Sequence, residues 1–188
     1  IKWCLNNFKK YVFLTEAMNV VNERKRPYIV MEGMSDRFMA TYKRPFEAKD
    51  IKVVMYAGGL HERYGLKKLT EAFMMLPQEN FRLKLFGSGP FVEKLKTKYT
   101  KKDSRIQYMG VAPNAEVVAA ELDASLLVNP RPTHEEFTKY SFPSKNIEYM
   151  ASGTPLLTTK LPGMPKEYYP YVFLIENESV EGLSLIHI

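Results

Sequence analysis

The chain has 188 residues, 45% of them hydrophobic, and its net charge is +6 at pH 7. This is enough apolar material for one ordinary domain with a core of its own. The only cysteine, Cys4, excludes an internal disulfide framework and fits a reducing compartment, and the sequence shows no signal-peptide pattern and no apolar run as long as a membrane span. The positive surplus lies mainly in residues 1–50, but such a bias is common on surfaces without an anionic partner, and we assign no nucleic-acid partner.

The first fifty residues predict two short strands followed by a connecting segment. Residues 11–15 have the pattern of a short buried strand, and a helical stretch follows through Arg24. Residues 27–33 predict a second strand that ends at a turn glycine. Residues 35–50 contain Pro45 and several basic side chains, which is typical of a linker.

From residue 51 onward, strands alternate with helices. The predicted strands cover residues 51–57, 82–86, 106–109 and 124–128. Glycines follow the first three of them, at Gly58-Gly59, Gly87-Ser-Gly89 and Gly110, and helical patterns begin after these turns. Such alternation predicts an α/β fold with a doubly wound parallel sheet and a backbone-lined pocket at the carboxyl end of its strands.

Residues 141–155 predict a short helix with a marker at each end. Pro143 suits the first turn, where its missing N–H costs nothing. Gly153 suits the position just past the last turn, and Pro155 forbids continuation. The N-terminus of such a helix attracts anions through its free N–H groups and its dipole.

Three side chains make this helix a candidate nucleotide site. Ser144 and Lys145 add a hydroxyl and a charge at the N-terminus, and Glu148 shares a face with Ser144 one turn further along. That offset, roughly 5 Å, matches the separation of a diphosphate from the neighbouring ribose hydroxyls. The same spacing also fits an ordinary capped surface helix with a Lys145–Glu148 ion pair.

The segment Pro143-Ser-Lys-x-x-Glu-Tyr-Met-Ala-Ser-Gly-Thr-Pro155 resembles the signature of family 4 glycosyltransferases, which have the GT-B fold. The resemblance implies that Glu148 binds the donor ribose. It also implies a remnant of the N-terminal acceptor domain in residues 1–34, an interdomain linker in 35–50 and a Rossmann-like donor-binding domain in 51–182. Residues 183–188 resemble a translated sequencing adapter and are set aside as a non-native tail.

The resemblance places donor binding on ten residues, namely Gly58, Gly59, Arg63, Val111, Tyr140, Ser141, Phe142, Ser144, Lys145 and Glu148. Where many family members have a phosphate-binding arginine and lysine, this sequence has Gly59 and Tyr64. Lys145, and after it Arg63, is then expected to supply the cation. Tyr140 stands where the family has the first of two glutamates.

Other kinds of site fit the sequence less well. The Gly87-x-Gly89 turn lacks the third glycine of a dinucleotide fingerprint, since Val92 holds that position, and no acidic residue ends the next strand. The three histidines have no metal-ligand spacing, and no Asp-x-Asp pair is present. We therefore expect neither a cofactor nor a metal.

The resemblance implies an enzyme that moves a sugar from a nucleotide diphosphate to a lipid-linked or polysaccharide acceptor in bacterial surface-polysaccharide synthesis. It implies a cytoplasmic location, compatible with peripheral association at the inner face of the plasma membrane. Catalytic residues are expected in the missing N-terminal domain, so this fragment should bind donor without turnover. The alternatives are another GT-B enzyme, such as a nucleotide-sugar epimerase, and a nucleotide-binding module without catalysis.

Overall fold

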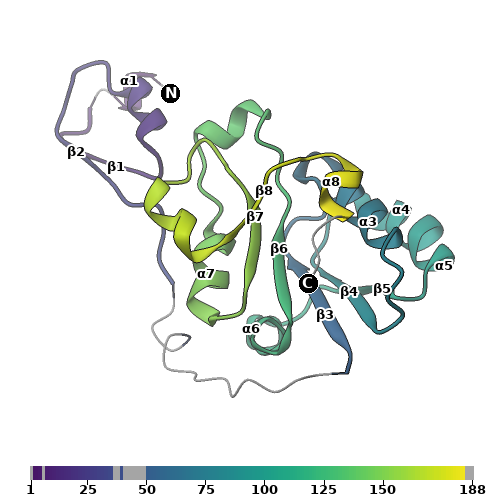
Figure 1. Cartoon of the computed structure of the whole chain (residues 1–188). Helices are drawn as coiled ribbons and strands as arrows, with labels where there is room; N and C mark the ends of the chain where they lie inside the picture. The colour runs from purple at the N-terminus through teal and green to yellow at the C-terminus, as the bar shows by residue number, and fades with distance from the viewer. Residues whose placement is uncertain (1, 6, 36–38, 40–49, 185–188) are drawn as a thin grey trace.

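The computed structural model describes residues 2–5, 7–35, 39 and 50–184, which form a small N-terminal unit and a larger α/β unit (Figure 1). The N-terminal unit contains helix α1 (Lys2–Leu5), strand β1 (Tyr11–Phe13), the 3₁₀ helix η1 (Glu16–Val21) and strand β2 (Tyr28–Val30). Strands β1 and β2 pair in parallel.

The larger unit is built on a six-stranded sheet in which every pairing is parallel. Its strands are β3 (Lys52–Ala57), β4 (Phe81–Phe86), β5 (Ile106–Gly110), β6 (Leu126–Asn129), β7 (Leu156–Thr159) and β8 (Phe173–Ile175). Their order in the sheet is β5-β4-β3-β6-β7-β8. Counted within the sheet this is the 3-2-1-4-5-6 order of doubly wound nucleotide-binding folds, which confirms the predicted fold class. The strand order reverses between β3 and β6.

Helices cover both faces of this sheet (Figure 1). They are η2 (Glu62–Tyr64), α3 (Leu66–Met74), α4 (Phe91–Lys94), the π-helix η3 (Leu95–Tyr99), α5 (Thr100–Lys102), α6 (Asn114–Asp123), η4 (Glu136–Lys139), α7 (Ser144–Ser152), η5 (Lys166–Tyr171) and α8 (Val180–Ser184). The predicted helix of residues 143–153 is α7, whose first residue directly follows Pro143.

The central strand β3 explains why the sheet is buried on both sides. Val54 and Tyr56 belong to the apolar core under α3, α4 and α8, whereas Val53 and Met55 belong to the core under α6 and α7. Alternate side chains of a strand point to opposite faces, so both sets must be apolar. For this reason polar and apolar residues do not alternate in the β3 segment of the sequence.

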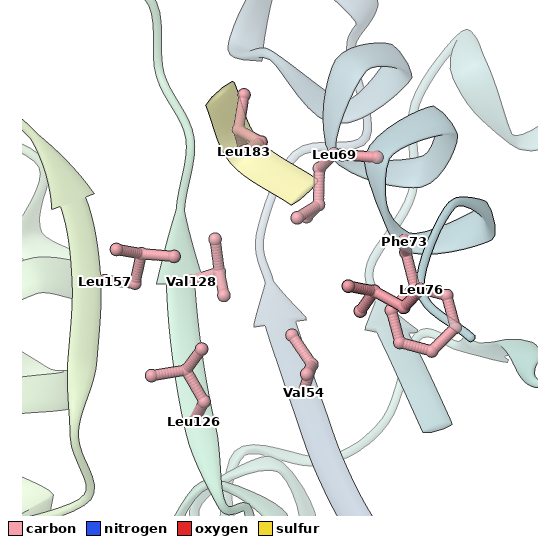
Figure 2. Close-up of a pocket in the computed structure, with 9 residues that line it drawn as sticks. Val54, Leu69, Phe73, Leu76, Leu126, Val128, Leu157 and Leu183 are labelled. Atoms are coloured by element: carbon pink, nitrogen blue, oxygen red, sulfur yellow. The ribbon is translucent and has the colours of Figure 1, made fainter. Parts of the chain in front are cut away.

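The core under α3 and α8 contains a small hollow of about 30 Å³ (Figure 2). Its lining side chains are all apolar: Val54, Leu69, Ala72, Phe73, Leu76, Leu126, Val128, Leu157 and Leu183. With no polar side chain in the lining, this hollow offers no chemistry for a charged ligand.

Three segments differ from the expectations or fall outside the described residues. The stretch after β1 is a 3₁₀ helix that ends at Val21, not a helix through Arg24. Of the predicted linker, residues 35–50, the structure describes only Ser35, Met39 and Asp50. Leu183, which the sequence interpretation placed in a tail, is 8% exposed and packs into the core from α8; residues 185–188 lie outside the described residues.

Candidate functional site

Two glycine turns form the floor of the site at the carboxyl ends of β3 and β4. The Leu60 N–H donates to the Ser88 carbonyl oxygen at 2.8 Å, so the two turns lie backbone to backbone. A Cβ on Gly87 would lie 1.9 Å from the Gly58 carbonyl oxygen, and the φ of Gly87 is 125°. Only glycine permits this approach. The Gly87 turn therefore supports the Gly58 turn.

Helix α7 is held against the end of β3 by a buried tyrosine. The Tyr149 hydroxyl accepts a hydrogen bond from the Ala57 N–H at 2.8 Å and lies 3.2 Å from the Ala57 carbonyl oxygen, to which it donates. Tyr149 is fully buried. This contact fixes α7 beside the last residue of β3.

A buried amide pair makes the second attachment of α7. The side-chain amide of Asn129, at the end of β6, donates to the Asn146 side-chain oxygen at 2.5 Å. The Asn146 amide in turn donates to the Thr158 hydroxyl on β7 at 3.3 Å. These contacts fix α7 against both strands and orient its first turn toward the point where the strand order reverses.

The first turn of α7 and the Gly58 turn enclose a hollow of about 260 Å³. It is lined by Tyr56, Ala57, Gly58, Gly59, Asn129, Arg131, Phe142, Pro143, Ser144 and Lys145. We call it the glycine hollow. It lies where a doubly wound sheet binds its ligand, outside the carboxyl ends of the strands on either side of the switch point. The lining combines free helix N–H groups with two cations, which suits an anion.

A second hollow of about 450 Å³ adjoins the first. Its lining residues are Met34, Ser35, Met39, Asn114, Ala115, Val118, Ser144 and Glu148. We call it the α6–α7 hollow. Ser144 lines both hollows, so they meet at the start of α7.

Lys145 lies between two carboxylates. Its Nζ is 2.8 Å from Glu148 Oε2 and 3.2 Å from Glu121 Oε1 on α6. Glu121 has no exposed surface, and its Oε2 has no hydrogen-bond partner among the described residues. Burial raises the pKa of the Glu121 carboxyl to about 7; the charge of Lys145 opposes this rise and that of Glu148 adds to it. The positive charge of Lys145 is thus largely compensated.

Arg131 is the charged residue among the five lining residues of the glycine hollow that the sequence interpretation missed; the others are Tyr56, Ala57, Asn129 and Pro143. Arg131 comes two residues after β6, and its guanidinium lies 4.6 Å from the ring centroid of Tyr64 and 5.5 Å from that of Phe137. Burial lowers its pKa, and the nearby charge of Arg63 adds to this decrease. A signal was present, because the residue follows a buried strand at the carboxyl edge of the sheet, as Gly58 does.

Four of the predicted donor-binding residues, Arg63, Val111, Tyr140 and Ser141, line neither hollow. Arg63 is exposed, and its guanidinium lies over the Tyr64 and Phe137 rings at 5.3 and 5.5 Å. Val111 is 75% exposed and Tyr140 is 39% exposed. Ser141 donates to the Phe137 carbonyl oxygen at 3.2 Å. Six of the ten predicted residues thus line a hollow, and the ligand contacts of all ten stay predictions.

Neither a metal site nor a membrane span is found among the described residues. No group of three or more His, Cys, Asp or Glu side chains there could hold a metal ion. None of the described helices is long and apolar enough to cross a membrane.

A family model described as "Glycosyl transferases group 1" matches residues 51–184. The chain belongs to this glycosyltransferase family. The match covers the six-stranded sheet, the whole lining of the glycine hollow and helix α7, whereas Met34, Ser35 and Met39 of the α6–α7 hollow lie outside it.

A curated relative of this chain is WcaL of Escherichia coli strain K12, whose name assigns it to colanic acid biosynthesis. The two are 30% identical over 112 residues, which are 57% of this chain and 27% of WcaL. WcaL of Salmonella typhimurium is 31% identical over the same length and share. The chain thus spans about a quarter of the curated relatives it matches.

Solved structures of GT-B glycosyltransferases share the fold. WaaG, a glycosyltransferase involved in lipopolysaccharide biosynthesis, matches with a TM-score of 0.69 at 17% identity, over 92% of this chain and 51% of WaaG. HepE of Anabaena, solved in complex with UDP and glucose, matches with a TM-score of 0.66 at 15% identity, over 95% of this chain and 52% of HepE. At these identities the likeness establishes the fold alone.

Proposed function

We propose that this chain is the donor-binding half of a family 4 glycosyltransferase. The whole enzyme would move a sugar from a nucleotide diphosphate to a lipid-linked or polysaccharide acceptor. The observation that carries the proposal is that Ser144 joins two hollows at the sheet's switch point, one lined by glycine backbone and cations and the other by Glu148.

In this proposal the nucleotide lies across the start of α7. The diphosphate occupies the glycine hollow, between the Gly58-Gly59 turn and the N-terminus of α7, whose first N–H groups attract an anion. The ribose lies beside Glu148, which accepts hydrogen bonds from its hydroxyls, and the base extends into the α6–α7 hollow beside Asn114. The UDP bound in the related HepE structure supports a nucleotide of this class.

The chemical contribution of this half is to stabilise the leaving group. When the bond between the sugar and the diphosphate breaks, negative charge grows on the diphosphate oxygens. Fixed N–H groups and cations already aimed at that position stabilise this charge without reorganising. We propose that the chain's own cations do so without a metal, and that a catalytic base comes from the acceptor half.

The pathway follows from the relatives. WcaL is assigned to colanic acid biosynthesis and WaaG acts in lipopolysaccharide biosynthesis, so we propose sugar addition in bacterial surface-polysaccharide synthesis. The nucleotide sugars for such reactions are cytoplasmic. We therefore place the protein in the cytoplasm, with its acceptor at the inner face of the plasma membrane.

Calorimetry with UDP and GDP in the presence of a chelator tests the proposal. We expect one of the two to bind in a single site without divalent metal, and no release of sugar from the matching nucleotide sugar. Binding that appears only after magnesium or manganese is added would contradict the metal-independent site. Failure of every nucleoside diphosphate to bind would overturn the function itself.

A further inference from the structure

Three cations surround the glycine hollow, and they differ in what already compensates their charge. Lys145 contacts two carboxylates, Glu121 and Glu148, at 3.2 and 2.8 Å. Arg63 is exposed and is absent from the lining of the hollow. Arg131 lines the hollow and, among the described residues, has no carboxylate partner. The three therefore have unequal capacity to hold a further anion.

Arg131 is also the cation whose burial most needs an anion. Its Nε is buried and has no hydrogen-bond partner within the described part of the chain. Its neighbours from the packed elements are Tyr56 on β3, the rings of Tyr64 and Phe137, and the like charge of Arg63. The aromatic faces attract a cation only weakly compared with a full negative charge. Arg131 is half-buried, and a charge that is partly buried without a counter-ion carries a cost that an anion entering the hollow would relieve.

The position of Arg131 is built rather than accidental. The Thr159 hydroxyl donates to its carbonyl oxygen at 2.6 Å, and Thr159 is 1% exposed. The preceding residue, Pro130, packs against Gly65 so closely that a Cβ on Gly65 would lie 2.0 Å from the Pro130 carbonyl oxygen. The backbone that carries the guanidinium is thus anchored from β7 and from the start of α3.

We propose that Arg131 is the phosphate-binding cation of this site. It takes the role of the arginine and lysine that many family members have at the positions of Gly59 and Tyr64. Its planar guanidinium can donate two parallel N–H bonds to phosphate oxygens, which an ammonium group cannot do. In this arrangement Lys145 is a positioning residue that orients the Glu148 carboxylate. The proposal rests on the proposed function, because it assumes that a diphosphate occupies the glycine hollow.

The test compares three variants, Arg131→Gln, Arg131→Lys and Arg63→Gln, by calorimetry with three probes. The probes are the nucleoside diphosphate that binds the wild type, its bare nucleoside, and inorganic pyrophosphate. We expect Arg131→Gln to weaken diphosphate and pyrophosphate binding at least tenfold and to leave nucleoside binding within twofold. Arg131→Lys keeps the charge without the two-pronged donor, so we expect a loss of about three- to tenfold.

Arg63→Gln removes the competing cation, because Arg63 lies over the same two rings but outside the lining. We expect it to weaken diphosphate binding less than Arg131→Gln does. If Arg131→Gln is unfolded at the assay temperature, the comparison of Arg131→Lys with wild type tests the proposal. Unchanged diphosphate affinity in both Arg131 variants, or an equal loss for diphosphate and nucleoside, overturns the proposal.

The probes separate this proposal from the proposed function. If the wild-type chain binds pyrophosphate through Arg131 but binds no nucleotide, the result contradicts the proposed function and supports Arg131 as the phosphate-binding cation. If the wild-type chain and both Arg131 variants bind a nucleoside diphosphate with the same affinity, the result supports the proposed function and contradicts the assignment of Arg131 as the phosphate-binding cation. Wild-type chain that binds none of the probes contradicts both.

Discussion

Glu148 is the residue on which the ribose assignment depends. Its carboxylate lines the α6–α7 hollow and is 21% exposed, so it is oriented by Lys145 yet accessible to a ligand. If it accepts bonds from both ribose hydroxyls, Glu148→Ala should weaken binding of nucleoside and nucleoside diphosphate alike. A hydrogen bond to a charged group is worth about 1.5–3 kcal/mol, which corresponds to a loss of roughly ten- to a hundredfold.

Calorimetry with both ligands measures this loss, and Glu148→Gln should fall between wild type and Glu148→Ala. Circular dichroism serves as the control for folding. Affinity that stays the same in Glu148→Ala, with the fold intact, would mean that the Lys145–Glu148 pair is only a surface ion pair of α7.

Because the Glu121 carboxyl is buried, we predict that the free energy of unfolding falls as pH rises. The pKa of about 7 in the folded chain exceeds the ordinary glutamate value of 4.5, so between these values the folded chain binds more protons than the unfolded one. The free energy of unfolding therefore decreases with rising pH across this window. The groups that face the carboxyl are Lys145, Glu148 and Tyr149 on α7.

Glu121→Gln removes the cost of ionising a buried carboxyl, while Lys145 keeps Glu148 as its partner. We expect the variant to exceed wild type in free energy of unfolding by about 1–3 kcal/mol near pH 8 and to lose this advantage near pH 5. Urea unfolding at both pH values measures the difference. Glu116→Gln, an exposed change on the same helix, should leave the pH dependence unaltered. A variant that is less stable than wild type at both pH values would show that the ion pair with Lys145 outweighs burial.

At the scale of elements, the two glycine turns act as one unit. The Gly87 N–H donates to the Gly110 carbonyl oxygen at 2.7 Å while its Cα lies against Gly58, so three strand ends are joined there. Gly87→Ala should therefore displace the Gly58 turn. We expect a loss of at least about 2 kcal/mol in free energy of unfolding, together with weaker diphosphate binding.

Gly153→Ala provides the matched comparison. Its φ is 73°, also in the left-handed region, but a Cβ there meets no heavy atom within 4 Å. It should cost only the conformational penalty, about 1 kcal/mol. Chemical denaturation of both variants measures the two losses. Equal losses would mean that the close approach of Gly87 to Gly58 contributes nothing beyond backbone conformation.

At the scale of the whole molecule, local chemistry was enough to predict most elements. The strand at residues 51–57 and the helix after Pro143 were predicted within one residue, because apolar runs, proline and glycine act on their nearest neighbours. The stretch after β1 was not: it forms a 3₁₀ helix, and the residue before it is held by a distant contact, in which the Thr15 hydroxyl donates to the Lys139 carbonyl oxygen. Tertiary contacts override weak local propensity in such segments.

The sequence by itself determined the alternation of strands and helices, the glycine turns and the helix that carries Ser144, Lys145 and Glu148. Only the tertiary structure decided which charges in the site are compensated. Glu121 reaches Lys145 across 24 residues of sequence, and Arg131 meets Tyr64 from a different strand end. The free charge of a cation depends on which carboxylates the fold brings within a few ångströms of it, and no local pattern encodes that distance.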